Sequence, residues 1–191
     1  MATISGVTVT KPTEAQITAW WKWATSFSKN TSPFEKGWEN ASDRNDRSQP
    51  RTGSVFFISC TGGQGGEDNA IRPLDAAKKS GKDILVPVFV AYGESESEAK
   101  KLLGKSNYVH FLVNGNPREA FYKETDVGSV NFAVDNSFDE DSGSKSIYSA
   151  GYWAKVSLRN LKNIQFGGMG GQINPNDQRE YQTLVTYGLT K

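Results

Sequence analysis

Two glycine-rich runs are the first places where the residue types could do chemistry, because the main-chain N–H groups of such runs can bind phosphate. They read FISCTGGQGGEDN at residues 57–69 and NIQFGGMGGQINP at residues 163–175. Neither run ends in the Lys-Ser/Thr pair of a P-loop, and neither has the G-x-G-x-x-G spacing of a dinucleotide site. We therefore predict flexible connections at one end of the fold, suited to docking, at Gly62, Gly63, Gly65, Gly66, Gly167, Gly168, Gly170 and Gly171.

An acidic stretch, DNSFDEDSGS, is the second candidate for chemistry. It holds Asp135, Asp139, Glu140 and Asp141 among turn residues, and Ca²⁺ prefers such oxygen ligands. The spacing differs from that of the twelve-residue EF-hand loop, so a solvated acidic loop is the alternative. Calcium is the one cofactor that the sequence suggests.

The residues that serve catalysis most often are scarce in this chain. His110 is the only histidine and Cys60 the only cysteine, so neither a histidine pair nor an intrachain disulfide can form. No H-E-x-x-H zinc motif and no G-x-S-x-G nucleophile motif occurs. A hydrolase that uses two carboxylates remains an alternative, because such a pair needs proximity in space and not in sequence.

Aromatic residues are the remaining resource, and five of them are tryptophans. Exposed rings stack on sugars or anchor protein interfaces, so the sequence offers a candidate contact set. The alternative for the helical group is that the helix packs its rings across a sheet. Tyr152 and Trp153 must point to opposite faces of their strand, so at most one of them is exposed. The contact set is Trp20, Trp21, Trp23, Trp38 and Trp153.

Composition bounds the class of protein. The chain has 191 residues, 36% hydrophobic and 12% aromatic, with a formal net charge of +1. We expect one packed domain, and the near-neutral charge argues against nucleic acid as a partner. No apolar run is long enough to span a membrane. The first residues lack the pattern of a signal peptide, so we expect synthesis in the cytoplasm.

The pattern of apolar and turn residues predicts a mainly β protein. Thr13 is a suitable N-cap for a helix over 12–27, a long polar loop follows over 28–52, and the core is expected over 53–191. The closure that suits eight or nine strands is an antiparallel β-sandwich of the jelly-roll type. Strands are predicted at 4–12, 53–61, 82–92, 107–115, 118–125, 128–136, 146–158, 162–168 and 181–190, with a second, short helix at 94–104.

Several stretches occur in an order that is familiar. They are Trp20 to Trp23, RTGSVFFIS, SGKDILVPVF, FLVNG, AGYWAKVSL, NIQFGG and VTYGLT. In these stretches the chain resembles a largely uncharacterised family of bacterial β-sandwich proteins. The histidine of that family before I-x-F-G-G is replaced here, around Lys162 and Asn163. The resemblance implies the β-sandwich and supplies no catalytic residue.

Taken together, these features favour a non-catalytic protein that works by surface contact. The form that we expect is an assembly or decoration subunit of a larger particle, such as a phage or virus, whose partner is a second copy or a neighbouring subunit. The particle surface is then its location. A carbohydrate-binding module that uses exposed aromatic rings is the alternative, and a carboxylate-dependent hydrolase is the other.

Overall fold

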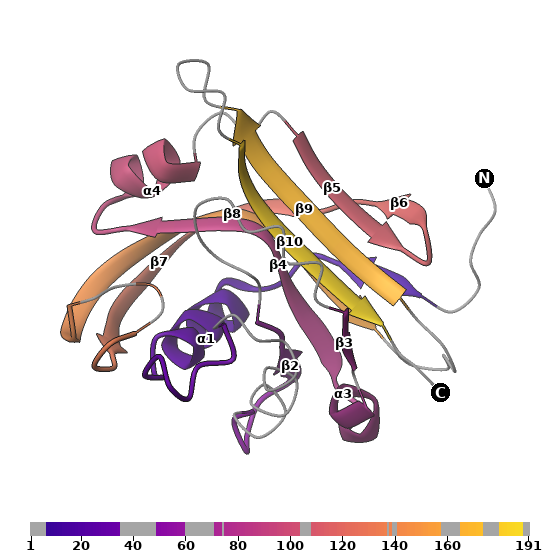
Figure 1. Cartoon of the computed structure of the whole chain (residues 1–191), viewed down its shortest axis with the longest axis horizontal. Helices are drawn as coiled ribbons and strands as arrows, with labels where there is room; N and C mark the ends of the chain where they lie inside the picture. The colour runs from indigo at the N-terminus through magenta and orange to yellow at the C-terminus, as the bar shows by residue number, and fades with distance from the viewer. Residues whose placement is uncertain are drawn as a thin grey trace.

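The computed structural model describes the chain at residues 7–34, 49–59, 71–73, 75–103, 108–136, 138, 141–157, 165–173 and 180–188. Side chains are described in these segments except at 71–76, 78, 102, 108, 165–173 and 180–188. This part of the chain consists mainly of strands, which form two sheets with helices beside them (Figure 1). The prediction of a mainly β protein is confirmed.

The first sheet is built around β8 (Gly143–Ser157), which is long enough to pair along both of its edges. On one edge it pairs antiparallel with β4 (Asp83–Gly93), and β4 pairs parallel with the short β2 (Val55–Phe57). On the other edge β8 pairs with β7 (Phe121–Phe132) and, beyond the end of β7, with β1 (Thr8–Thr10). Among the described strands, β4 is the one neighbour of β2.

Two local signals of the sequence, one in each sheet, are confirmed. Pro87 demands an edge, a bulge or a strand end, and the pairing of β4 with β8 shifts register between Pro87 and Phe89. Asn114 and Gly115 form the turn of a hairpin, with φ of 49° and 72°. A turn with two positive φ angles suits the twist of the flanking strands.

Strand β7 corrects one predicted boundary. The sequence predicts separate strands at 118–125 and 128–136, but one strand runs from Phe121 to Phe132. Its pairing with β8 shifts between Asp126 and Gly128, where Gly128 has a φ of 70°. The Asp126 carboxylate accepts a hydrogen bond from the Gly128 N–H at 3.0 Å, which holds this bulge within the strand.

The second sheet has the strand order β3-β10-β9-β5-β6. Its outer members are β3 (Ile71–Pro73), which pairs parallel with β10 (Glu180–Gly188), and β6 (Asn116–Arg118), which pairs with β5 (Tyr108–Val113). The parallel pairs β2–β4 and β3–β10 depart from the wholly antiparallel connections that the sequence predicts. In Figure 1 the strands of this sheet cross in front of β4 and β8.

The second glycine run is the main error of the sequence-based interpretation. Gly167, Gly168, Gly170 and Gly171 belong to β9 (Gln165–Ile173), which pairs with β5 on one edge and β10 on the other. They form an interior strand and are not a flexible connection. Sheets that pack face to face usually lie about 10 Å apart, yet Cα atoms of β9 come within 8 Å of β4. A strand with few side chains permits this close approach.

The helices lie beside the sheets: α1 (Glu14–Ala24), the short α3 (Asp75–Ser80) and α4 (Glu96–Leu103). Thr13 is the N-cap of α1 as predicted, and its hydroxyl accepts from the Gln16 N–H while the Gln16 amide oxygen accepts from the Thr13 N–H. This capping box fixes the start of α1. Helix α4 confirms the predicted helix at 94–104.

The two larger helices cover opposite faces of the first sheet. Alternation along β8 places Trp153 on one face and Ala150 on the other. Trp20 of α1 packs edge-on against Trp153, with ring centroids 5.3 Å apart. On the opposite face, Ala99 and Leu103 of α4 pack with Ala150.

Candidate functional site

Three of the five tryptophans predicted to make contacts lie in the core. Trp20 and Trp153 are fully buried and Trp21 is 1% exposed. Their rings pack on one another and on neighbouring aromatic side chains, so they offer no surface to a partner. For these three the contact prediction is wrong, and the alternative of a helix packed across a sheet is confirmed. Trp38 lies outside the described residues.

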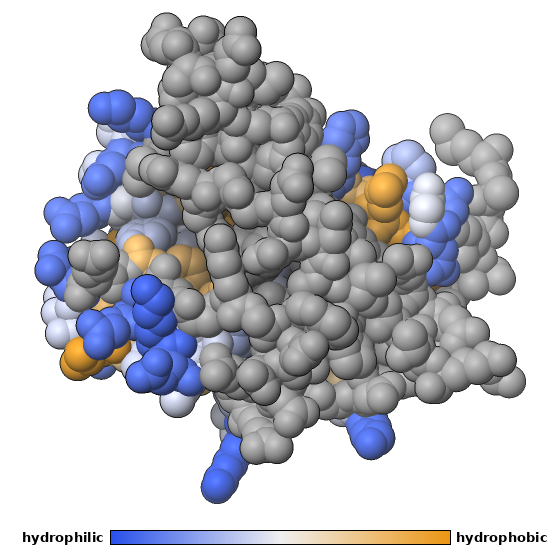
Figure 2. Space-filling model, viewed as in Figure 1, coloured by the Kyte–Doolittle hydropathy of each residue, from blue (hydrophilic) through white to orange (hydrophobic). Residues whose placement is uncertain are grey.

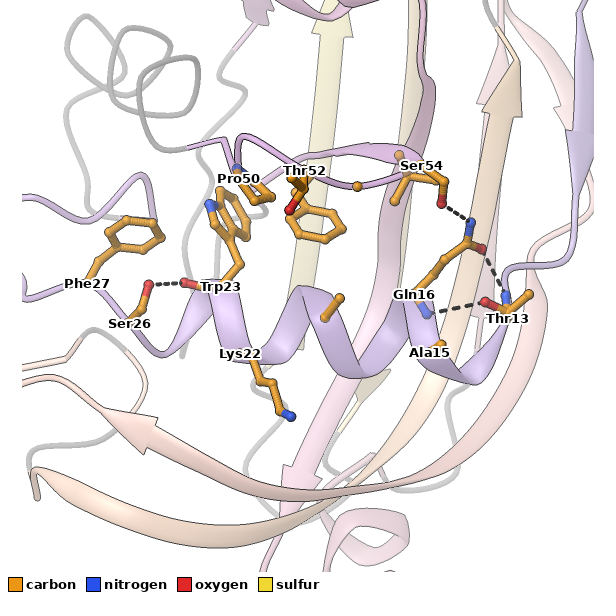
Figure 3. A pocket seen from close by; sticks show the side chains of 14 residues that line it. Thr13, Ala15, Gln16, Lys22, Trp23, Ser26, Phe27, Pro50, Thr52 and Ser54 are labelled. Atoms are coloured by element: carbon orange, nitrogen blue, oxygen red, sulfur yellow. Dashed lines mark hydrogen bonds between the residues drawn. The ribbon is translucent and has the colours of Figure 1, made fainter.

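Trp23 is also buried, but it borders a groove of about 730 Å³ between α1 and the segment 50–57. Figure 3 shows its ring standing between α1 and Pro50. The floor includes the buried Val55 and Phe57. The exposed rim includes Ala15, Ala19, Lys22, Ser26, Thr52 and Ser54.

The ends and the charge of this groove are defined by a few side chains. The Gln16 amide donates a hydrogen bond to the Ser54 hydroxyl at 3.3 Å, which ties α1 to the segment above it (Figure 3). Among the described residues that line the groove, Lys22 is the one that carries a charge. Its side chain extends from the side of α1 that lies away from Pro50, Thr52 and Ser54 (Figure 3).

Gln49 lies beside β2, close to this groove. Its side-chain amide donates to the Phe57 carbonyl oxygen and accepts from the Phe57 N–H, both at 2.8 Å. A primary amide that bonds in both directions reproduces the donor and acceptor of a main-chain peptide group. Gln49 thus satisfies the main chain at Phe57 in the place where a further strand would pair.

A tyrosine cluster lies on the α4 side of the first sheet and was not anticipated from the sequence. Tyr122 of β7 is 40% exposed, and its ring centroid is 5.2 Å from that of Tyr152 on β8. The sequence predicts that at most one of Tyr152 and Trp153 is exposed. Trp153 is fully buried, so this prediction is confirmed. The described surface over α4 and the neighbouring ends of β7 and β8 is mostly hydrophilic (Figure 2).

The charges of this cluster are coupled through Glu124. Its carboxylate accepts from Lys100 at 2.8 Å and from the Tyr122 hydroxyl at 2.9 Å, while Lys100 also pairs with Glu96. The hydrogen bond from Lys100 is the main reason that the pKa of Glu124 is lowered. Burial, followed by the hydrogen bond and charge of Glu124, raises the pKa of Tyr122 to about 12.

Glu124 is poorly suited to be the proton donor of a carboxylate-dependent hydrolase. A retaining or inverting glycosidase needs one carboxyl group whose pKa is raised, so that it can donate a proton. The pKa of Glu124 moves in the opposite direction because Lys100 stabilises its ionised form. The Lys100 ammonium lies between Glu96 and Glu124 and pairs with both carboxylates.

We predict an acid-dependent effect for Glu124→Gln. A lowered pKa in the folded state means that the stability from Glu124 is present above the ordinary pKa, near 4.5, and is lost as the pH falls through the folded-state value. The wild type should therefore melt at a higher temperature than the variant at neutral pH, and this difference should shrink below pH 4.5. Melting curves from neutral to acid pH measure it, and a difference that persists unchanged at low pH contradicts the prediction.

The predicted calcium ligands are only partly placed. Asp139 and Glu140 lie outside the described residues. Asp135 is exposed, and Asp141 forms an ion pair with Lys145 at 3.7 Å. Within the described segments, no group of three or more His, Cys, Asp and Glu side chains gathers as a metal site would require.

Other predicted features fall outside the candidate sites. The first glycine run, with Gly62, Gly63, Gly65 and Gly66, and Cys60 lie beyond the described residues. His110 lies on β5 with an exposed side chain. In the described part of the chain, no helix has the length and apolar character needed to cross a membrane.

Comparisons with known proteins give no match that assigns this chain to a family. The resemblance to bacterial β-sandwich proteins accordingly stays a prediction from the sequence. Neither protein-family models, nor curated proteins, nor solved structures give a match to this chain.

Proposed function

We propose that this chain is a non-catalytic surface-contact protein, an assembly or decoration subunit of a larger particle such as a phage or virus. The observation that supports the proposal is the groove between α1 and segment 50–57, with its apolar floor of Trp23, Val55 and Phe57. Apolar surface gathered in a concave site with a polar rim is typical of a place that binds a partner. For the scaffold we infer a β-sandwich, from the way the second sheet crosses β4.

The helix side of the groove is well suited to a partner. Ala15 and Ala19 expose small side chains, so a neighbour can approach the helix closely. The capping box at Thr13 and the packing of Trp20 hold α1 in place. A groove that is held in place beforehand costs less conformational entropy on binding than one that must form.

We predict that Ala19→Arg abolishes the assembly without unfolding the chain. Ala19 is exposed on α1 and arginine is a good helix former, so the folded state should tolerate the change. The long charged side chain fills the groove and adds a second cation beside Lys22. Light scattering over a wide concentration range and at several salt levels should show a discrete oligomer or particles for the wild type and monomers for the variant.

Ser97→Arg is the matched control, because Ser97 is an exposed position on α4, away from the groove. This variant should assemble like the wild type. A wild type that stays monomeric in isolation is tested next with the purified particle. If Ala19→Arg and the wild type behave alike in both measurements, the assembly role of the groove is wrong.

A carbohydrate-binding module is the second candidate, and the tyrosine cluster favours it. The exposed ring of Tyr122 offers a face for a sugar ring, and Lys100, Glu96 and Glu124 offer hydrogen bonds to hydroxyl groups beside it. A charge network held this way is already oriented before a ligand arrives.

Tyr122→Ala should remove glycan binding, and Leu112→Ala should not. Leu112 is a fair control because it is also a large side chain, 41% exposed, and lies on β5 away from the tyrosine cluster. Removing a stacked ring is expected to weaken binding by about tenfold, since aromatic contacts contribute on the order of 1 kcal/mol. A glycan array with no signal for the wild type, or equal signals for both variants, counts against this function.

A further inference from the structure

We propose that a long-lived water molecule is bound beneath α1, at a small polar site formed by Thr125, Ser149 and Trp21. The site is separate from the groove and from the tyrosine cluster, so it goes beyond the contact function proposed above. Its ligand is defined by its chemistry: a small neutral molecule that both donates and accepts hydrogen bonds.

The first support is the position of the two hydroxyl groups. Thr125 of β7 and Tyr92 of β4 are the direct partners of Ser149 on β8, one on each side. Residues that lie directly opposite each other project to the same face of a sheet. The ring of Trp21 lies over this row, with its centroid 5.2 Å from that of Tyr92. The three polar side chains therefore gather between α1 and the first sheet.

The second support is that these groups are buried without a partner. Thr125 is 3% exposed, Ser149 0% and Trp21 1%. Within the described part of the chain, neither hydroxyl makes a hydrogen bond, and the Trp21 indole N–H has no acceptor. A buried polar group without a partner costs folding free energy, so folded proteins rarely contain one that neither protein nor water satisfies. Three such groups in one region indicate a common partner.

The third support is the match between these groups and water. An indole N–H only donates, whereas a hydroxyl both donates and accepts. A water oxygen can accept from Trp21 and from one hydroxyl while a water proton is donated to the other hydroxyl. This arrangement gives the three hydrogen bonds that are typical of a buried water molecule.

An ion is a poorer occupant than water. None of the three groups at the site carries a charge, and a buried ion without an opposite charge is costly. Lys123, two residues before Thr125 on the same face of β7, directs its ammonium to Glu14 at 3.8 Å. The remaining alternative to water is a direct hydrogen bond between the two hydroxyls after a change of rotamer.

The test uses the full chain, with water itself as the probe. Two-dimensional NMR detects contact transfer from water to indole N–H protons, with a sign that separates contact from proton exchange. Trp21 should show a strong transfer. Trp20 is the internal control and should show none, because its indole N–H donates to the Ile58 carbonyl oxygen at 2.9 Å. Trp21→Phe identifies the resonance.

Two variants remove one hydroxyl each and nearly keep the shape of the side chain: Thr125→Val and Ser149→Ala. Oxygen-17 relaxation, which counts long-lived internal water molecules, should show one fewer in each variant. Each should raise the unfolding equilibrium constant about fivefold, and the double variant by less than the product, because both hydroxyls bind the same water. Ser146→Ala is the matched control, since Ser146 is exposed on the other face of β8.

Each other result overturns the site. A lack of transfer at Trp21, or an unchanged water count in either variant, shows that the hydroxyls are satisfied without water. A count that falls equally in Ser146→Ala places the lost water elsewhere, and fully additive effects show that the hydroxyls do not share one molecule. The transfer to Trp21 is measured on the wild type, so it decides the proposal even when a variant fails to fold.

Discussion

Trp20→Ala is expected to cost about 4 kcal/mol of folding free energy, because truncation of a fully buried tryptophan leaves a cavity that the surroundings fill only in part. The Trp20 side chain is 0% exposed, and its ring lies 4.9 Å from that of Trp21 and 5.3 Å from that of Trp153. Its indole N–H also donates to the Ile58 carbonyl oxygen at 2.9 Å. A loss of this size is a large part of the stability of an ordinary domain, about 5–15 kcal/mol.

Denaturant unfolding measures the effect, and two further variants make it interpretable. Trp20→Phe keeps an aromatic ring and loses the bond to Ile58, so we expect an intermediate loss of about 2 kcal/mol. Val134→Ala changes a side chain that is 65% exposed and should cost less than about 0.5 kcal/mol. If Trp20→Ala unfolds like the wild type but no longer assembles, Trp20 is a contact residue after all and the packing argument is wrong.

Asn136→Ala is expected to cost about 3 kcal/mol, because three hydrogen bonds are lost together. The buried Asn136 amide donates to the carbonyl oxygens of Thr25 and Phe27 at 2.9 and 2.7 Å, and its oxygen accepts from the Phe138 N–H at 2.9 Å. These bonds join the end of α1 to the segment after β7. Removal leaves the Thr25 carbonyl buried without this donor.

Asn136→Asp separates the loss of hydrogen bonds from the loss of volume. The carboxylate has nearly the same shape as the amide, but it faces two carbonyl oxygens and has no proton to donate. We expect a pKa raised above the ordinary value at this position, so the Asp variant should gain stability as the pH falls and lose it as the pH rises. Melting curves at several pH values check this. A pH-independent Asp variant, or an Ala variant as stable as the wild type, contradicts the role given to Asn136.

The main errors of the sequence analysis came from features that have two physically reasonable outcomes. A run of glycines suits a flexible loop, and glycine weakens an isolated strand, but β9 gains main-chain hydrogen bonds on both edges and a close approach to β4. Tryptophans at helical spacing suit either a contact surface or a core. Only the position of α1 against Trp153 places Trp20 and Trp21 inside.

The candidate sites were the least predictable part of the molecule. Glu124 and Lys100 lie far apart in the sequence, on β7 and α4, and meet only because α4 packs on that face of the sheet. Gln49 lies in a stretch that reads as a polar loop, and nothing local indicates that its amide bonds to the main chain of Phe57. A sequence search for aromatic residues close to charged ones could have suggested Tyr122, two residues before Glu124.

The mainly β character, the capping box at Thr13, the hairpin turn at Asn114-Gly115 and the bulge at Pro87 can all be predicted from the sequence. These features depend on main-chain angles and hydrogen bonds within a few residues, so the local residue types specify them. Packing sets which aromatic rings are buried, where the glycine-rich strand lies, and which polar groups surround the groove and the tyrosine cluster. Burial and charge pairing depend on residues distant in the chain, and only packing brings these residues together.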